Sequence, residues 1–211
     1  MLLMSFRRVY LVIVSLIFIC NTSIAQNSIH LLPKSSSIRV FGTSNVYDWE
    51  LYVELQKKTP NYKIPNNSIK DLKNILFKID GHKLKSKENA MEKMAHKKLN
   101  LSSFPHISFL LKEITIKNHK ATSFNALAIG TFLVSGQQKD VILPINGNFI
   151  GNKKMNLTGH IDLKLSDFKI DLPSAFFGLV SADDEIKILY SLDFASKKKL
   201  TEDMLIFNLT P

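Results

Sequence analysis

The chain has 211 residues, a formal net charge of +10 and one cysteine, Cys20. A single cysteine excludes a disulfide framework and a cysteine-ligated metal site, and the length favours one domain with its own hydrophobic core. The basic residues occur in short groups throughout, which is typical of a solvated surface, although they would also attract an anionic membrane surface. We expect no nucleic-acid binding, because the sequence has no aromatic–basic RNA motif and no recognition helix.

Residues 1–25 have the pattern of a signal peptide. A pair of arginines precedes an apolar run over residues 9–20, which is short for a membrane-spanning helix, and Ser23-Ile24-Ala25 places small residues before a cleavage point. This pattern predicts cleavage before Gln26 and a periplasmic or secreted protein. An uncleaved N-terminal anchor is the alternative.

The dominant pattern downstream is the alternation of apolar and polar residues, which is the period of a half-buried β-strand. Trp49, Leu51, Val53 and Leu55 alternate with polar residues, and this segment, 47–55, is predicted to form a hairpin with a strand that ends at Gly42. Six later segments alternate in the same way, at residues 75–79, 107–111, 124–133, 141–145, 155–165 and 186–194. The sequence therefore predicts eight strands separated by turns.

One segment has helical spacing instead. Met91, Met94, Ala95 and Leu99 recur at intervals of three and four residues within 86–100, which predicts one amphipathic helix with Ser86 as its N-cap. We interpret the two methionines as core-facing rather than as part of a flexible ligand lid. The polar residues 56–67, with two prolines, are predicted to form a loop.

Eight antiparallel strands and one helix leave two architectures, a sandwich and a closed up-and-down barrel. An eight-stranded barrel can enclose one small ligand where its interior residues are small. Ala126, Ala128, Gly130 and Gly159 share the phase of bulky apolar neighbours, which predicts room inside. The strand at 124–133 is apolar on both faces, so its second face is either covered by the helix or lines a cavity.

Short motifs follow one another in a fixed order along the chain. They are Gly42-Thr43-Ser44 with Asp48-Trp49, Met91-Glu92-Lys93-Met94, Phe104-Pro105-His106-Ile107-Ser108-Phe109, Ala128-Ile129-Gly130-Thr131-Phe132 through Ser135-Gly136, Val141-Ile142-Leu143-Pro144-Ile145, and Pro173-Ser174-Ala175-Phe176-Phe177-Gly178 before Asp184-Glu185-Ile186. From about Ser36 to Phe194 the chain resembles the YceI-like family in these motifs. Gln137-Gln138 and residues 195–211 depart from the family pattern.

The resemblance implies a mainly β fold, an eight-stranded antiparallel lipocalin-like β-barrel with one amphipathic α-helix, over residues 26–195. It also implies export and a lumen that binds an isoprenoid or another amphiphilic chain. Residues 196–211 are expected to form a C-terminal tail, in which Leu205, Ile206 and Leu209 would add an edge strand or cover the barrel mouth.

No arrangement of residues typical of catalysis is present. The six histidines show no metal-ligand spacing, and His106 and His160 fall on the outward phase of their strands. Asp183-Asp184-Glu185 is interpreted as a solvated turn rather than as a cation site. No nucleophile elbow and no phosphate-binding glycine loop occur. We therefore expect neither an enzyme nor a metal or cofactor site.

The leading hypothesis is an exported lipid-binding barrel without catalytic activity. The candidate lumen residues are Trp49, Leu51, Phe77, Phe109, Ala128, Phe132 and Ile188. For Trp49, a role as a core anchor is favoured over one of closing the cavity against a ligand. The alternative function is an extracytoplasmic interaction module with a filled core, which the 14 phenylalanines support. The oligomeric state stays open, a homodimer included.

Overall fold

The structure is a computed structural model, and it describes residues 27–57, 60–64, 68–172, 174–175, 180–197 and 199–200. The predicted signal peptide and residues 201–211, with Leu205, Ile206 and Leu209, lie outside the described residues. Strand β12 ends at Ser196. Leu200 is buried, and its backbone N–H donates to the Asn152 carbonyl at 2.7 Å, so the chain turns back onto the barrel there.

All eight predicted strands are present, and the mainly β fold class is confirmed. They are β2 (Ser37–Ser44), β3 (Trp49–Val53), β5 (Ile75–Asp80), β7 (His106–Lys120), β8 (Ser123–Val134), β9 (Gln137–Ile150), β10 (Lys154–Lys164) and β12 (Val180–Ser196). The described residues add four short strands that were not predicted, β1 (Asn27–Leu31), β4 (Asn61–Ile64), β6 (Leu84–Lys85) and β11 (Ser174–Ala175).

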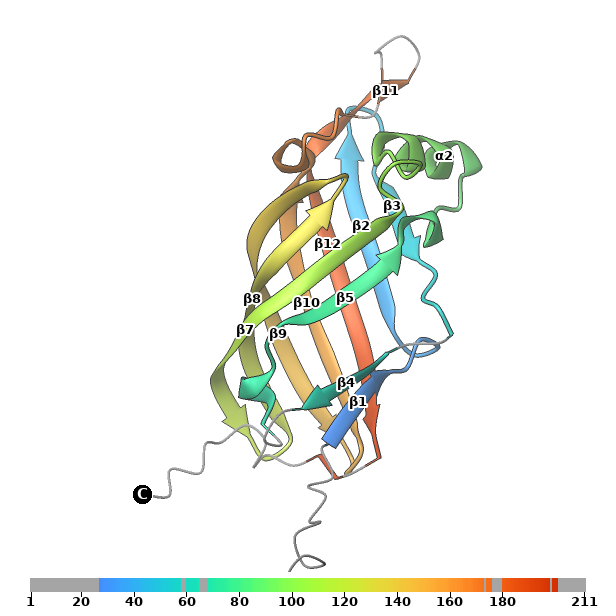
Figure 1. The fold of residues 1–211 in the computed structure, drawn as a ribbon. Coiled ribbons are helices and arrows are strands. Elements are labelled where there is room, and N and C mark those ends of the chain that lie inside the picture. Colours follow the sequence, from blue (N-terminus) through green and yellow to red (C-terminus); the bar gives the residue numbers. More distant parts are fainter. Residues whose placement is uncertain are drawn as a thin grey trace, which may run out of the picture.

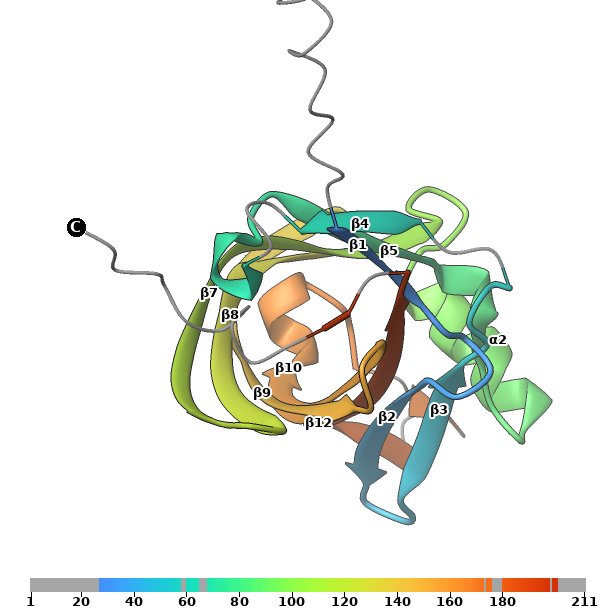
Figure 2. The ribbon, with the colours of Figure 1, turned by 90° about the horizontal axis from the view of Figure 1, so that it is seen from below.

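The strands form one antiparallel sheet that curls into a nearly closed barrel rather than a sandwich (Figures 1 and 2). The hydrogen-bonded order is β5-β7-β8-β9-β10-β12-β2-β3-β6. The two ends of this order, β5 and β6, are joined by the short 3-10 helix η3 (Gly81–Lys83), whose Gly81 N–H donates to the Pro105 carbonyl at 2.8 Å. β1 pairs with both β12 and β4, and these two short strands lie across the lower end of the barrel in Figure 1.

Two strand boundaries differ from the prediction for local reasons. Residues 56–67 were predicted to be a loop, but this segment contains β4, whose Ile64 is 0% exposed. The flanking prolines are typical of a loop, so the sequence pattern does not indicate this short strand. β7 continues to Lys120, nine residues past the predicted end at Leu111, because bulges after Leu111 and Ile116 shift the apolar phase.

The predicted helix is confirmed as α2 (Asn89–Lys98), and α2 stands outside the barrel between β3 and β5 (Figure 2). Its N-cap is Glu88 rather than Ser86, whose Oγ instead accepts from the Glu88 N–H at 3.2 Å. Met91 and Ala95 are half-buried and pack against Leu51, Val53 and Leu84. Among the described residues, no helix has the length and hydropathy needed to cross a membrane.

The tightest packing lies at the end of the barrel near β1 and β4. Its members are buried to 4% exposure or less and are here called the basal cluster: Ile29, Ile64, Ile69, Met155 and Phe194. Ile69 comes from η2 (Ile69–Asp71), which contacts β7. The short strands β1 and β4 and η2 thus close this end with side chains.

The outer face of β8 is not buried by the helix. Leu127, Ile129 and Leu133 are half-exposed there, while the opposite face carries the buried Phe124, Ala126 and Ala128. Of the two alternatives for this two-sided strand, lining an interior space is the one that the structure supports, and only its inner face does so.

Candidate ligand-binding cavity

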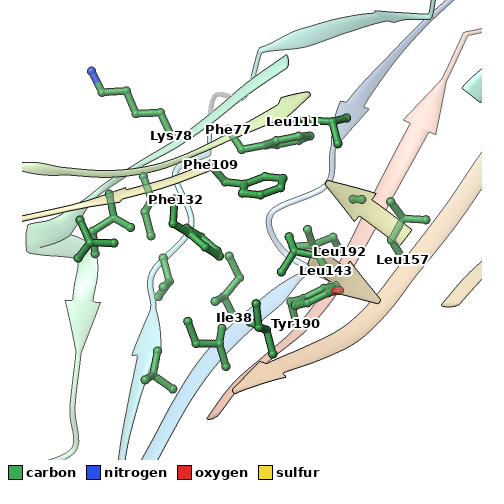
Figure 3. A pocket seen from close by; sticks show the side chains of 18 of the residues that line it. Ile38, Phe77, Lys78, Phe109, Leu111, Phe132, Leu143, Leu157, Tyr190 and Leu192 are labelled. Atoms are coloured by element: carbon green, nitrogen blue, oxygen red, sulfur yellow. The ribbon is translucent and has the colours of Figure 1, made fainter. Parts of the chain in front are cut away.

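The barrel encloses a cavity of about 350 Å³, and the basal cluster bounds it at one end, with all its members except Ile64 among the lining residues. Side chains from almost every strand of the barrel wall line it, and Figure 3 shows Phe77, Phe109 and Phe132 on one wall opposite Leu143, Leu192 and Tyr190 on the other. Nearly all described lining residues are aliphatic or aromatic. A cavity of this size and composition is in the range that binds small apolar ligands.

Aromatic rings form a continuous row along one wall. Phe77, Phe109 and Phe132 are direct cross-strand partners on β5, β7 and β8. Their ring centroids are 6.5 Å and 5.1 Å apart, and Tyr62 continues the row 4.9 Å from Phe77. These rings present a flat apolar surface that runs from the basal cluster, where Tyr62 meets Phe194, towards the opposite end of the cavity.

Glycines hold some of these rings against the wall. A Cβ at Gly130 would lie 2.4 Å from the ring of Phe109, and one at Gly159 would lie 2.2 Å from the hydroxyl of Tyr190. Gly147 is covered by Phe124 in the same way. The predicted room inside the barrel is present, but the space next to these glycines is occupied by aromatic rings. At each of these glycines a ring from a neighbouring strand takes the space that a Cβ would need, so a larger residue there would displace the ring.

Some of the side chains that line the cavity are only partly buried. Ile186, Ile188 and Leu192 on β12 alternate with outward residues and line the cavity, yet each is only half-buried. A packed core would bury such side chains fully, as the basal cluster does. Their residual exposure is consistent with empty space beside them, whereas Phe109, Leu111 and Ala128, which line the same cavity, are buried by their neighbours.

The structure places all seven predicted lumen residues on the wall of this one cavity. Trp49 and Leu51 come from β3, Phe77 from β5, Phe109 from β7, Ala128 and Phe132 from β8, and Ile188 from β12. Strand alternation identified the correct face in each case. That these residues contact a ligand stays a prediction.

Trp49 lies at one end of the cavity and is half-buried. Its ring covers Gly42, where an added Cβ would lie 2.0 Å from a ring carbon, and its indole Nε1–H donates to the Thr43 carbonyl at 3.0 Å. It therefore fastens the β2–β3 hairpin and also borders the lumen, while its role in closing the cavity against a ligand stays a prediction.

The few polar groups of the lining include two tyrosines. Burial raises the pKa of Tyr190 to about 12, and its hydroxyl donates to the Pro144 carbonyl. Burial also raises the pKa of Tyr62. The remaining polar side chains of the described lining are Lys78 and Lys98.

Sequence reasoning missed lining residues from the short elements. Ile29 and Leu31 on β1, Tyr62 on β4, and Ala95 and Lys98 on α2 all border the cavity. Tyr62 and Ile64 do alternate with Asn61 and Lys63, so a strand signal was present, but it spans only four residues. For Lys98, helical spacing from Met91 and Ala95 was a usable signal.

The acidic run at residues 183–185 forms no turn, contrary to the prediction. It lies within β12 at a bulge, where Asp183 accepts from the Thr43 hydroxyl at 2.5 Å. Asp184 accepts from the backbone N–H and hydroxyl of Ser166, and these hydrogen bonds lower its pKa. These carboxylates tie neighbouring segments of the barrel rim together.

The histidines at 106 and 160 are exposed on the outside of the barrel, as their phase predicted. In the part of the chain that the structure describes, no three histidine, cysteine or carboxylate side chains gather in a geometry that could hold a metal ion.

Comparisons with known proteins agree with this architecture. A family model, YceI-like domain, matches residues 30–194. A polyisoprenoid binding domain from Saccharophagus degradans, implicated in plant cell wall breakdown, superposes with a TM-score of 0.59 at 8% identity, covering 81% of this chain and 99% of that chain. BcnA from Burkholderia cenocepacia superposes with a TM-score of 0.57 at 15% identity, covering 77% and 98%. A search of curated proteins found no match.

At these identities the two structures show a shared fold. The family model covers well over half of the sequence, and its span contains the walls of the cavity from β2 to β12. The chain therefore belongs to the YceI-like family, as its motifs predicted.

Proposed function

We propose that this protein holds the apolar chain of an isoprenoid or similar amphiphile in the barrel lumen and performs no reaction on it. The observation that carries the proposal is the cavity of about 350 Å³ with its almost wholly apolar lining. Each CH₂ group transferred from water to such a lining contributes about 0.8 kcal/mol. A chain of a few prenyl units can therefore bind without a dedicated polar contact.

The shape of the lining supports a chain rather than a compact ring system. The row of Tyr62, Phe77, Phe109 and Phe132 runs along the wall, so a flexible chain can lie against successive rings. The similar domain from Saccharophagus degradans is described as polyisoprenoid binding, which supports the same ligand class.

The site of action that we propose is the periplasm or the extracellular space. The support is the signal-peptide pattern over residues 1–25. The net charge of +10 supports a further role for anionic membrane surfaces as the place where the ligand is exchanged.

A filled-core interaction module fits less well, because the interior is hollow. The direct test is to purify the protein, extract it with organic solvent and identify any bound lipid by mass spectrometry. We expect an isoprenoid or another long-chain amphiphile at a fixed ratio to the protein. Repeated absence of lipid, together with no uptake of a fluorescent prenyl probe, would contradict the proposal and favour the module.

A further inference from the structure

Lys98 lies on the face of α2 that packs against the barrel, where helical spacing predicts an apolar side chain. The face of α2 that meets the barrel carries Met91, Ala95 and Leu99, and Lys98 follows Ala95 by three residues on this same face. Lys98 is half-buried and borders the cavity. Its neighbour Lys97 is exposed.

A second lysine borders the cavity from β5, the strand at one end of the sheet order. Lys78 is exposed on the outward phase of β5, and its ammonium points away from the row of rings in Figure 3 while its stem borders the cavity. Because α2 stands beside β5, the two lysines come from neighbouring elements of the fold, and both border the cavity. Lysine commonly lays its stem along apolar surface in this way.

The charged side chains described on this border of the cavity are all basic. The described residues that line the cavity include Lys78 and Lys98 and no aspartate or glutamate. Neither ammonium forms an ion pair with a described residue, whereas Lys85 nearby pairs with Glu92 at 2.8 Å. An unpaired cation beside an apolar lumen attracts an anion strongly, because the low-dielectric wall screens the charge less than water does.

The helix dipole does not explain Lys98. Cations at a helix C-terminus are favourable, but the exposed Lys97 already supplies positive charge to the last turn of α2. The half-buried position of Lys98 on the face towards the barrel calls for another reason. Residues that break the local pattern without a structural reason are often functional.

We propose that the ligand is an amphiphile with an anionic headgroup, a phosphate or a carboxylate, which binds at the cavity border beside Lys98 and Lys78 while the chain lies inside. This rests on the proposed function and adds the chemistry of the polar end. The apolar chain supplies most of the affinity, and the lysines set the orientation in which the chain enters.

The test compares two probes that share one chain, geranylgeraniol and geranylgeranyl phosphate, in titrations of the full mature protein at low salt. We expect the phosphate to bind about 3- to 10-fold more tightly than the alcohol. Lys98→Met should remove most of that difference by weakening phosphate binding more than alcohol binding, and Lys78→Met should do so in part. Added salt should have the same effect.

Lys97→Met is the matched control, since it removes the same charge from the next residue of the same helix. It should leave both affinities unchanged. Equal binding of alcohol and phosphate by the wild type, or equal losses in the Lys97 and Lys98 variants, would overturn the anionic-headgroup proposal while the lumen site stands. Failure of both probes to bind would overturn the proposed function itself.

Discussion

The basal cluster and the lumen above it are built from the same kinds of side chain, yet one is packed and the other is hollow. In the basal cluster, β1, β4 and η2 cover the end of the sheet, and Ile64 and Ile69 are 0% and 1% exposed. In the lumen, Ile186 and Ile188 have the same inward phase but remain half-buried. Alternation decides which face of a strand is inside, whereas short covering elements decide whether that inside is filled.

Truncating one isoleucine in each region should show the largest difference in stability between the two regions. Ile64→Ala in the basal cluster should lower the free energy of unfolding by about 3–4 kcal/mol, because it leaves a new void in a packed region. Ile188→Ala removes the same atoms from a wall that already faces a hollow, so we expect a loss of about 1 kcal/mol. Denaturant unfolding of both variants measures the difference. Equal losses would mean that the lumen is packed like the basal cluster.

The glycine–aromatic pairs allow a second comparison within the wall. In Gly159→Ala, the new Cβ would meet both the Pro144 carbonyl and the Tyr190 hydroxyl at 2.2 Å, so the ring must move into the lumen. We expect a loss of about 2 kcal/mol in the free energy of unfolding. Gly151→Ala is a weaker control for space, because nothing lies within 4 Å there, although its φ of +60° adds some strain. An unperturbed Gly159→Ala variant would contradict the tight ring contact.

The half-buried Tyr190 of the lumen allows a further test through the pH dependence of stability. The pKa of Tyr190 is raised from 10 to about 12 in the folded state, so its contribution to stability is complete below pH 10. That contribution is lost as the pH rises through 12, and it amounts to about 2 kcal/mol after allowance for partial exposure. Tyr190→Phe should flatten this part of the pH–stability curve relative to the wild type. Parallel curves between pH 10 and 12 would show that the hydroxyl is solvated.

Much of the fold could be predicted from the sequence because a period of two is preserved over the central strands. The phases of Phe77, Phe109 and Ile188 follow from it directly. It fails where bulges reset the phase, as after Leu111, and where a strand is as short as β4. The acidic run at 183–185 was predicted to be a solvated turn because three acidic residues stand side by side, whereas β12 continues through them with a bulge.

The candidate site was only partly predictable. The face of each lumen residue follows from alternation, but the volume between opposite walls depends on how rings fold onto glycines, and this is a property of three-dimensional packing. Gly130 illustrates this limit of sequence-based prediction. The sequence indicates free space at Gly130, whereas in the structure the ring of Phe109 covers it.

The most direct test of the hollow lumen is a titration with geranylgeraniol, followed through the emission of Trp49, the only tryptophan of the chain and a residue that borders the cavity. We expect saturable binding at one ligand per chain in the wild type. Binding should weaken at least tenfold in Ala128→Phe and in Leu157→Phe, which add a ring to the cavity wall in two different strands. No saturable change in the wild type, or undiminished binding by both variants in a folded state, would contradict the account.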